Sequence, residues 1–209
     1  LAVNVVDKAG NVAPRAGGTV HVTLDRVAPT GGITSPAQDS YLTSDSVPIV
    51  VSAADSGSGI KDVTFLVSTC GTGQWTSIGT DTNGGDGWRM TWDASGVPDC
   101  GVGFHVFIHD NAGNTRSTGI SATLDRTPPT SFVNGLPDTQ RTDSFEVTWS
   151  GYDAPSGIIR YQVQVRDGSG GTWTTWYTGS ASSATYNGYN AHTYYFRCRA
   201  TDAAGNVET

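Results

Sequence analysis

Acidic side chains recur at matching places in the two halves of this 209-residue chain, and their chemistry is the easiest to name. The first set consists of Asp25, Asp55 and Asp110, and the second set consists of Asp125, Asp153 and Asp202. Asn114 and Asn206 follow the last aspartate of each set and add amide oxygens. Carboxylate and amide oxygens are the ligands that Ca²⁺ prefers, in groups of about six to eight. Each set is therefore a candidate Ca²⁺ site if the fold brings its members together.

Three short motifs carry these aspartates, and they show that the chain is a tandem repeat. Thr-Leu-Asp-Arg begins at residue 23 and again at residue 123. Asp-x-x-Ser-Gly-Ile begins at residues 55 and 153, and Asp-x-Ala-Gly-Asn begins at residues 7, 110 and 202. Glycine, asparagine and aspartate are typical of hairpin corners and loops. We therefore expect these aspartates to lie between strands.

Alternating apolar residues predict that the elements between the motifs are short β-strands. Val47, Ile49 and Val51 share one strand face, as do Phe145 and Val147 in the later copy. Glycine accounts for 27 of the 209 residues and charged residues for only 15%, which favours an all-β protein with many turns. About seven such strands in roughly 100 residues predict one Greek-key sandwich for each repeat.

This order of strands and turns resembles the bacterial immunoglobulin-like and fibronectin type III-like repeats of secreted or cell-surface proteins. The most specific segments are Trp149-Ser-Gly-Tyr-Asp153, Tyr161-Gln-Val-Gln-Val165, Trp173-Thr-Thr-Trp176 and Tyr194-Tyr-Phe-Arg-Cys198. We therefore predict an all-β fold of tandem immunoglobulin-like (fibronectin type III-like) Greek-key β-sandwiches. The expected domains are the C-terminal hairpin of a preceding immunoglobulin-like domain (1–25), an immunoglobulin-like sandwich (26–126), and a fibronectin type III-like sandwich lacking its last strand (127–209).

In a sandwich of this topology, the linker that enters a domain, one inter-sheet loop and the last hairpin meet at the same end. Each set of aspartates should therefore converge at a domain junction. The resemblance to adhesin repeats implies junctions braced by Ca²⁺. The alternative is that the aspartates only accept backbone hydrogen bonds in turns and pair with Arg26 or Arg126.

The three cysteines leave several pairings open because their number is odd. We expect a disulfide between Cys70 and Cys100, since each lies at a strand end of the same predicted domain. Tyr194, Phe196 and Cys198 are every second residue of their strand and so share one apolar face. This pattern predicts a buried thiol in the core of the second sandwich. A disulfide would place the protein outside the cytoplasm.

Other site chemistry has less support in the sequence. Motifs of a nucleophile elbow, a phosphate loop or a zinc protease are absent, so no catalytic residue is expected. An aromatic platform that stacks on sugars remains open, and its candidates are Trp75, Trp173 and Trp176. Trp149 lies on the apolar face of its strand and is expected in the core.

The expected function is a non-catalytic structural repeat that spaces, stiffens or assembles an extracellular bacterial surface protein, adhesin or filament. The alternative is an accessory carbohydrate- or protein-binding module of a secreted hydrolase. The net charge of -7 disfavours nucleic acid, and no apolar run is long enough to insert into a membrane. The expected partners are flanking domains or other copies of the same protein, with strand exchange between incomplete end domains as one route. Both ends of the sequence suggest a piece of a longer secreted chain.

Overall fold

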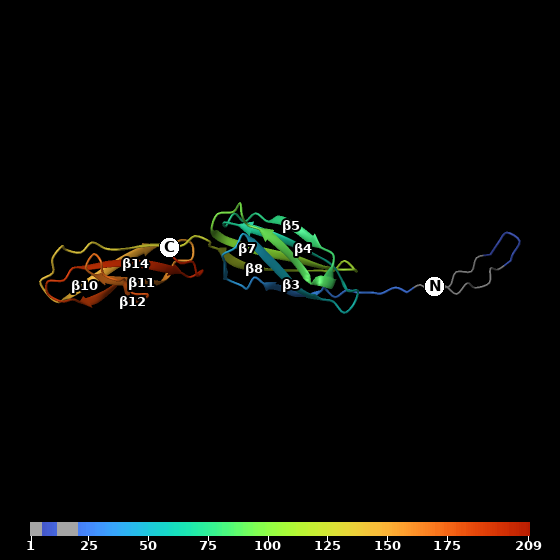
Figure 1. The fold of residues 1–209 in the computed structure, drawn as a ribbon. Coiled ribbons are helices and arrows are strands. Elements are labelled where there is room, and N and C mark those ends of the chain that lie inside the picture. Colours follow the sequence, from blue (N-terminus) through green and yellow to red (C-terminus); the bar gives the residue numbers. More distant parts are fainter. Residues whose placement is uncertain (1–5, 12–20) are drawn as a thin grey trace.

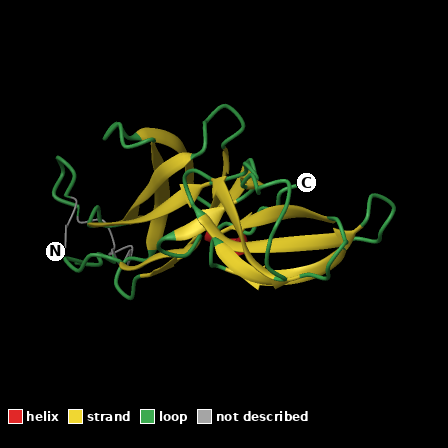
Figure 2. Cartoon of the chain, turned by 90° about the vertical axis from the view of Figure 1, so that its left-hand side faces the viewer, coloured by secondary structure: helices red, strands yellow, loops and turns green. Residues whose placement is uncertain are grey.

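The computed structural model describes residues 6–11 and 21–209. Two β-sandwiches follow one another along the long axis and are joined by a short linker (Figure 1). Strands and loops make up nearly all of the fold (Figure 2), and the described residues contain one short 3₁₀ helix, η1 (Gly84–Asp86). The all-β tandem sandwich predicted from the sequence is therefore confirmed. The expected hairpin of a preceding domain (1–25) falls largely outside the described residues.

The first sandwich packs a three-stranded sheet against a five-stranded sheet. The smaller sheet has the order β1 (Thr30–Ser35), β3 (Ser46–Ala54) and β6 (Trp88–Asp93). The larger sheet has the order β2 (Ser40–Leu42), β8 (Thr115–Leu124), β7 (Cys100–Asp110), β4 (Ile60–Thr69) and β5 (Thr76–Asp81). Neighbouring strands are antiparallel except β2 and β8, which run parallel. The chain crosses between the sheets at most of its connections, whereas β4–β5 and β7–β8 are neighbouring pairs within the larger sheet.

The core of the first sandwich follows the period-two pattern of its strands. Ile49 of β3, Phe65 of β4 and Phe104 of β7 are completely buried between the sheets. Trp92 of β6 packs edge-on against Phe104 with ring centroids 5.5 Å apart. Burial of apolar surface contributes about 25 cal/mol per Å², so this packing holds the sheets together and fixes the strand ends.

A disulfide joins Cys70 and Cys100, as the sequence predicts. Cys70 directly follows β4, and Cys100 is the first residue of the neighbouring strand β7. The Cys70 backbone N–H donates to the carbonyl oxygen of Gly101 at 2.8 Å. The bridge closes a loop of 30 residues in sequence separation, which restricts the unfolded chain.

The second sandwich repeats this plan with two three-stranded antiparallel sheets. One sheet has the order β13 (Ser183–Asn187), β10 (Ser144–Tyr152) and β9 (Thr130–Val133). The other has the order β12 (Thr174–Gly179), β11 (Ile158–Asp167) and β14 (Tyr194–Asp202). After β14 the chain turns back, and Val207 forms one antiparallel bridge with Thr201.

Aromatic side chains fill the core of the second sandwich. Trp149 is only 1% exposed, and its ring contacts Tyr161, Trp176 and Tyr177. The Trp149 Nε1–H donates to the carbonyl oxygen of Ala181 at 2.8 Å, so its polar atom is satisfied. Trp149 is thus the largest fully buried side chain of this core.

The free thiol of Cys198 also packs against this core, as the sequence suggests. Its Sγ lies 3.3 Å from Ser131 Oγ, and burial raises the pKa of the thiol. A thiol with a raised pKa is a poor nucleophile, so a packing role suits Cys198.

Candidate functional site: the acidic junctions

The Asp-x-Ala-Gly-Asn motif forms a turn that is closed by its own aspartate. Asp110 Oδ1 accepts hydrogen bonds from the backbone N–H groups of Ala112 (2.9 Å) and Asn114 (2.8 Å). Gly113 has φ 95°, in the left-handed region that glycine adopts without strain. The equivalent aspartate and asparagine are bonded in the other copies, Asp7 with Asn11 and Asp202 with Asn206. The geometry of the turn therefore accounts for aspartate, glycine and asparagine at these positions without a metal ion.

The Ser-Gly-Ile motif places a second aspartate beside this turn. Asp55 Oδ2 accepts hydrogen bonds from three successive backbone N–H groups, those of residues 57–59, at 2.7 to 3.1 Å. Asp153 Oδ2 accepts from the Gly157 N–H at 2.8 Å and from Ser156 Oγ at 3.2 Å. Within the described residues, the Oδ1 atoms of both aspartates accept no hydrogen bond, so their lone pairs are available to a ligand.

Asp25 completes the cluster at the outer end of the first sandwich. One carboxylate oxygen from each of Asp25, Asp55 and Asp110 lies within 4.8 Å of the others. Asp25 comes from the linker before β1, and its Oδ2 accepts from the Ser58 N–H at 2.8 Å. A Cβ at Gly57 would lie 2.5 Å from the Asp25 carboxylate, so glycine makes this approach possible.

The second cluster lies where the linker between the sandwiches enters the second one. Oxygens of Asp125, Asp153 and Asp202 again lie within 4.8 Å of one another. Asp125 Oδ2 accepts from the Ser156 N–H at 3.2 Å, as Asp25 does from Ser58. Asp125 and Asp202 are completely buried. Both sets of aspartates thus converge at the places that the repeat predicts.

The two candidate asparagines point their amide nitrogens, and not their oxygens, at the clusters. Asn114 Nδ2 donates to Asp110 Oδ2 at 2.7 Å and to the linker carbonyl of Asp25 at 3.4 Å. Asn206 Nδ2 donates to Asp202 Oδ2 at 2.8 Å and to the linker carbonyl of Asp125 at 3.2 Å. In this orientation the asparagines brace the linker, and the carboxylates are the candidate ligands.

The clusters bring like charges together. At such separations two carboxylates repel each other by roughly 3 kcal/mol at an effective dielectric constant of about 20. Burial raises the pKa of Asp153, and the neighbouring charges of Asp125 and Asp202 raise it further. Among the ion pairs of the described residues, none involves an aspartate of either cluster. A cation bound here would relieve the repulsion.

Arg126 does not neutralise Asp125, although the two are neighbours in the sequence. Its guanidinium turns back to the first sandwich, where Nε donates to Asp99 Oδ1 at 2.9 Å and Nη1 pairs with Asp45. Nη1 also donates to the carbonyl oxygen of Ala94 at 3.2 Å. Arg126 therefore ties the linker to the first sandwich.

Replacement of Arg126 by alanine is expected to destabilise the first sandwich by about 1–3 kcal/mol at neutral pH. Burial opposes ionisation of Asp99, but hydrogen bonds from Thr127 and Arg126 outweigh it and lower its pKa. A lowered carboxyl pKa gives stability that is present above the unfolded value of about 3.9 and is lost as pH falls through the folded value. Thermal melts between pH 7 and pH 3 should therefore show a smaller acid-induced loss in the variant.

Arg89→Ala is the control for this experiment, because Arg89 pairs with Asp86 on the surface. Exposed pairs contribute little, so its melting temperature should follow wild type at every pH. If the melting temperature of Arg126→Ala also followed wild type at every pH, the contacts of Arg126 with Asp45 and Asp99 would have no role in stability.

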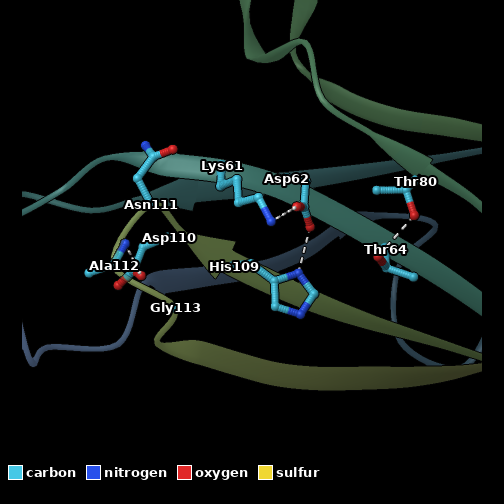
Figure 3. A pocket seen from close by; sticks show the side chains of 9 residues that line it. All are labelled: Lys61, Asp62, Thr64, Thr80, His109, Asp110, Asn111, Ala112 and Gly113. Atoms are coloured by element: carbon cyan, nitrogen blue, oxygen red, sulfur yellow. Dashed lines mark hydrogen bonds and ion pairs between the residues drawn. The ribbon is translucent and has the colours of Figure 1, made fainter.

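A shallow hollow lies beside Asp110 on the outer face of the larger sheet (Figure 3). A hydrogen bond of 2.5 Å joins His109 Nδ1 to Asp62 Oδ1, and Lys61 Nζ lies 3.5 Å from Asp62 Oδ2. The hydroxyls of Thr64 and Thr80 bond each other at 3.0 Å. The polar groups of the hollow thus pair with one another on a half-exposed sheet face.

The three tryptophans considered for sugar stacking have different surroundings. Trp176 belongs to the core, with its ring centroid 6.1 Å from that of Trp149. The ring of Trp173 is covered by two arginine guanidinium groups at 4.4 and 4.7 Å. Trp75 is 48% exposed and lies across Gly103. Trp75 is therefore the candidate of the three that presents an open ring.

Residues 29–122 match the family model described as a bacterial Ig domain. The match spans the first sandwich, which is less than half of the chain. The first sandwich is therefore similar to bacterial Ig domains, as the sequence indicates. A comparison with curated proteins gives no match.

Three solved structures that resemble this chain contain more than one domain. A tetra-tandem repeat from the extending region of a large adhesion protein is 22% identical, with 98% of this chain and 52% of that chain covered and a TM-score of 0.42. Titin domains A168–A170 are 17% identical, with 87% and 63% covered and a TM-score of 0.52. Three domains of the bacteriophage RB49 outer capsid protein Hoc are 11% identical, with 86% and 64% covered and a TM-score of 0.46. The chain spans about half to two thirds of these structures, and the titin likeness shows the tandem immunoglobulin-like fold.

Proposed function

We propose that the chain is a non-catalytic structural module that spaces and stiffens an extracellular bacterial surface protein, adhesin or filament. The observation that carries this proposal is the linker between the sandwiches, which is bonded to both. The Asp125 backbone N–H donates to the Leu42 carbonyl of the first sandwich at 2.9 Å, while its Oδ2 accepts from Ser156 of the second at 3.2 Å. Pro128 and Pro129 follow and restrict the backbone further.

Ca²⁺ is the proposed stiffening ligand at both junctions. It would bind the three carboxylates of each cluster, and the free Oδ1 atoms of Asp55 and Asp153 favour this role. A bound ion would neutralise the carboxylates and join three segments that are far apart in the sequence: the linker, the Ser-Gly-Ile loop and the Asp-x-Ala-Gly-Asn turn.

An extracellular location is supported by the disulfide between Cys70 and Cys100, since such bonds persist in oxidising compartments. The match of residues 29–122 to a bacterial Ig domain favours the same setting. No helix among the described residues is long and apolar enough to cross a membrane. The proposed partners are flanking domains or other copies of the same protein.

Small-angle X-ray scattering in Ca²⁺ and in EDTA tests the proposal. In Ca²⁺ we expect the scattering curve to fit conformers of one elongated shape with similar maximum dimensions, because the linker is bonded to both sandwiches. In EDTA the range should widen and the melting temperature should fall, as expected when a ligand of the folded state is removed. Independent movement of the two sandwiches in both buffers would contradict the spacer function. Identical rigid scattering and identical melting in both buffers would contradict the Ca²⁺ sites alone.

A further inference from the structure

One face of the sheet β12–β11–β14 carries four arginines on two neighbouring strands. Val163, Val165 and Ala200 point inward and are buried. Successive side chains of a strand point to opposite faces, so the residues between them face solvent. The outward residues, which we call the arginine face, are Arg160, Gln162, Gln164 and Arg166 of β11 and Tyr195, Arg197 and Arg199 of β14.

The arginines of this face have no acidic partner. Among the ion pairs of the described residues, none involves Arg160, Arg166, Arg197 or Arg199. These four are drawn from only 12 Lys and Arg in a chain of net charge -7. Four arginines without an acidic partner therefore lie together on one sheet face of an acidic protein.

The nearby carboxylates are engaged elsewhere. Glu208 lines the same hollow as Arg197 and Arg199, but Glu208 Oε1 accepts from the Ser131 N–H at 2.7 Å and its Oε2 accepts from the Ala200 N–H at 3.0 Å. Asp167, at the end of β11, is hydrogen-bonded to a histidine, with 2.5 Å between His192 Nδ1 and Asp167 Oδ2. Both carboxylates thus have hydrogen-bond partners outside the arginine face.

Two of the guanidinium groups are held in place by glutamines. Arg197 Nε donates to Gln164 Oε1 at 2.8 Å, and Arg199 Nε donates to Gln162 Oε1 at 2.8 Å. These bonds use the inner nitrogen of each guanidinium and leave the terminal N–H groups free. The amide nitrogens of both glutamines are additional donors.

Arg166 is fixed by stacking and has an unused donor. Its guanidinium carbon lies 4.7 Å from the ring centroid of Trp173 and 4.8 Å from that of Tyr195. Arg166 Nε is buried and has no hydrogen-bond partner. A buried donor without a partner costs free energy, and an acceptor that reached it would remove this cost.

We infer that the arginine face binds a linear polysaccharide that carries carboxylates along its chain. The terminal guanidinium groups of Arg197 and Arg199 and the amide nitrogens of Gln162 and Gln164 are donors, so the partner that suits them is rich in acceptors and negatively charged. Planar guanidinium groups pair with carboxylates through two parallel hydrogen bonds. Outward side chains recur about every 6.6 Å along a strand, which suits an extended polymer with repeated anions better than a single small anion.

Affinity electrophoresis with hyaluronate in the gel tests this inference, with neutral dextran as the comparison polymer. The gels contain EDTA, so that bridging by Ca²⁺ is excluded and the result does not depend on the proposed junction sites. Wild type should be retarded by hyaluronate and not by dextran, less so at higher salt. The double variant R197Q/R199Q should bind about 10- to 100-fold more weakly, since each charge-assisted hydrogen bond it removes contributes substantially.

The double variant K61Q/R89Q is the matched control, because it removes two exposed cations from the first sandwich. It should bind hyaluronate like wild type, and both double variants should melt near the wild-type temperature. Absence of retardation of wild type by hyaluronate would overturn the inference. An equal loss of hyaluronate binding in both double variants would also overturn it, because binding would then depend on net charge alone. Sedimentation of wild type as a dimer that only R197Q/R199Q dissociates, without polysaccharide binding, would assign the face to a second copy instead.

Discussion

Asp153→Asn is expected to raise the melting temperature of the second sandwich in EDTA and to lower it in saturating Ca²⁺. Burial and the charges of Asp125 and Asp202 raise the pKa of Asp153, so its ionised form destabilises the folded state at neutral pH. Asparagine removes that charge and still accepts the hydrogen bond from Gly157. In Ca²⁺ the same change removes a ligand, and wild type gains about 2.7 kcal/mol at a concentration 100-fold above Kd.

The pH dependence of wild type provides a second readout of the same cluster. A carboxyl pKa that is raised in the folded state means that the folded protein binds more protons than the unfolded chain. Without Ca²⁺, the contribution of Asp153 to stability should therefore increase as pH falls through its folded pKa. With Ca²⁺ the sign should reverse, because protons compete with the ion for the carboxylates.

Two variants control this experiment, and calorimetry in both buffers is the measurement. Asp138→Asn removes an exposed carboxylate of the same sandwich and should change neither response. Asp55→Asn alters the equivalent cluster and should shift the transition of the first sandwich. A Ca²⁺-dependent rise that persists undiminished in Asp153→Asn would show that the second cluster is not the binding site.

The repeated motifs made the clusters predictable because each motif has its own physical reason to lie at a strand end. Gly113 and Gly205 have φ 95° and 93°, which a hairpin corner requires, and their aspartates close the turns. Alternating apolar residues assign the strands that bring the turns to one end. Sandwich topology then places Asp25 and Asp125 beside them. Motif spacing and sandwich topology together were sufficient to predict where the two aspartate clusters lie.

Side-chain orientation could not be predicted in the same way. The sequence offers Asn114 as an oxygen donor, whereas in the fold its amide nitrogen faces Asp110. Arg126 lies next to Asp125 in the chain, but its long side chain reaches Asp45 and Asp99 instead. The arginine face was also missed, although alternate arginines and glutamines in β11 and β14 carry its signal. These outcomes depend on the pairing register between strands, which a local pattern does not specify.

Trp149→Ala is expected to destabilise the second sandwich by about 3–5 kcal/mol. The indole is 1% exposed, contacts three other aromatic rings, and donates to the Ala181 carbonyl, which the variant leaves without that partner. A domain of this size has a free energy of unfolding of about 5–15 kcal/mol, so a large share is removed. Each kcal/mol lowers the melting temperature of such a domain by about 4–8 °C, and calorimetry should resolve the shift.

Trp173→Ala is the matched control, because the same residue type is removed from the outer face of the same sandwich. Its ring contacts two guanidinium groups there, and cation–π contacts at exposed sites contribute about 0.5–1 kcal/mol. The transition of the first sandwich, whose core contains Phe65 and Phe104, should stay in place in both variants. If Trp149→Ala lowered both transitions equally, the sandwiches would unfold as one cooperative unit, and the separate cores would not set their stabilities.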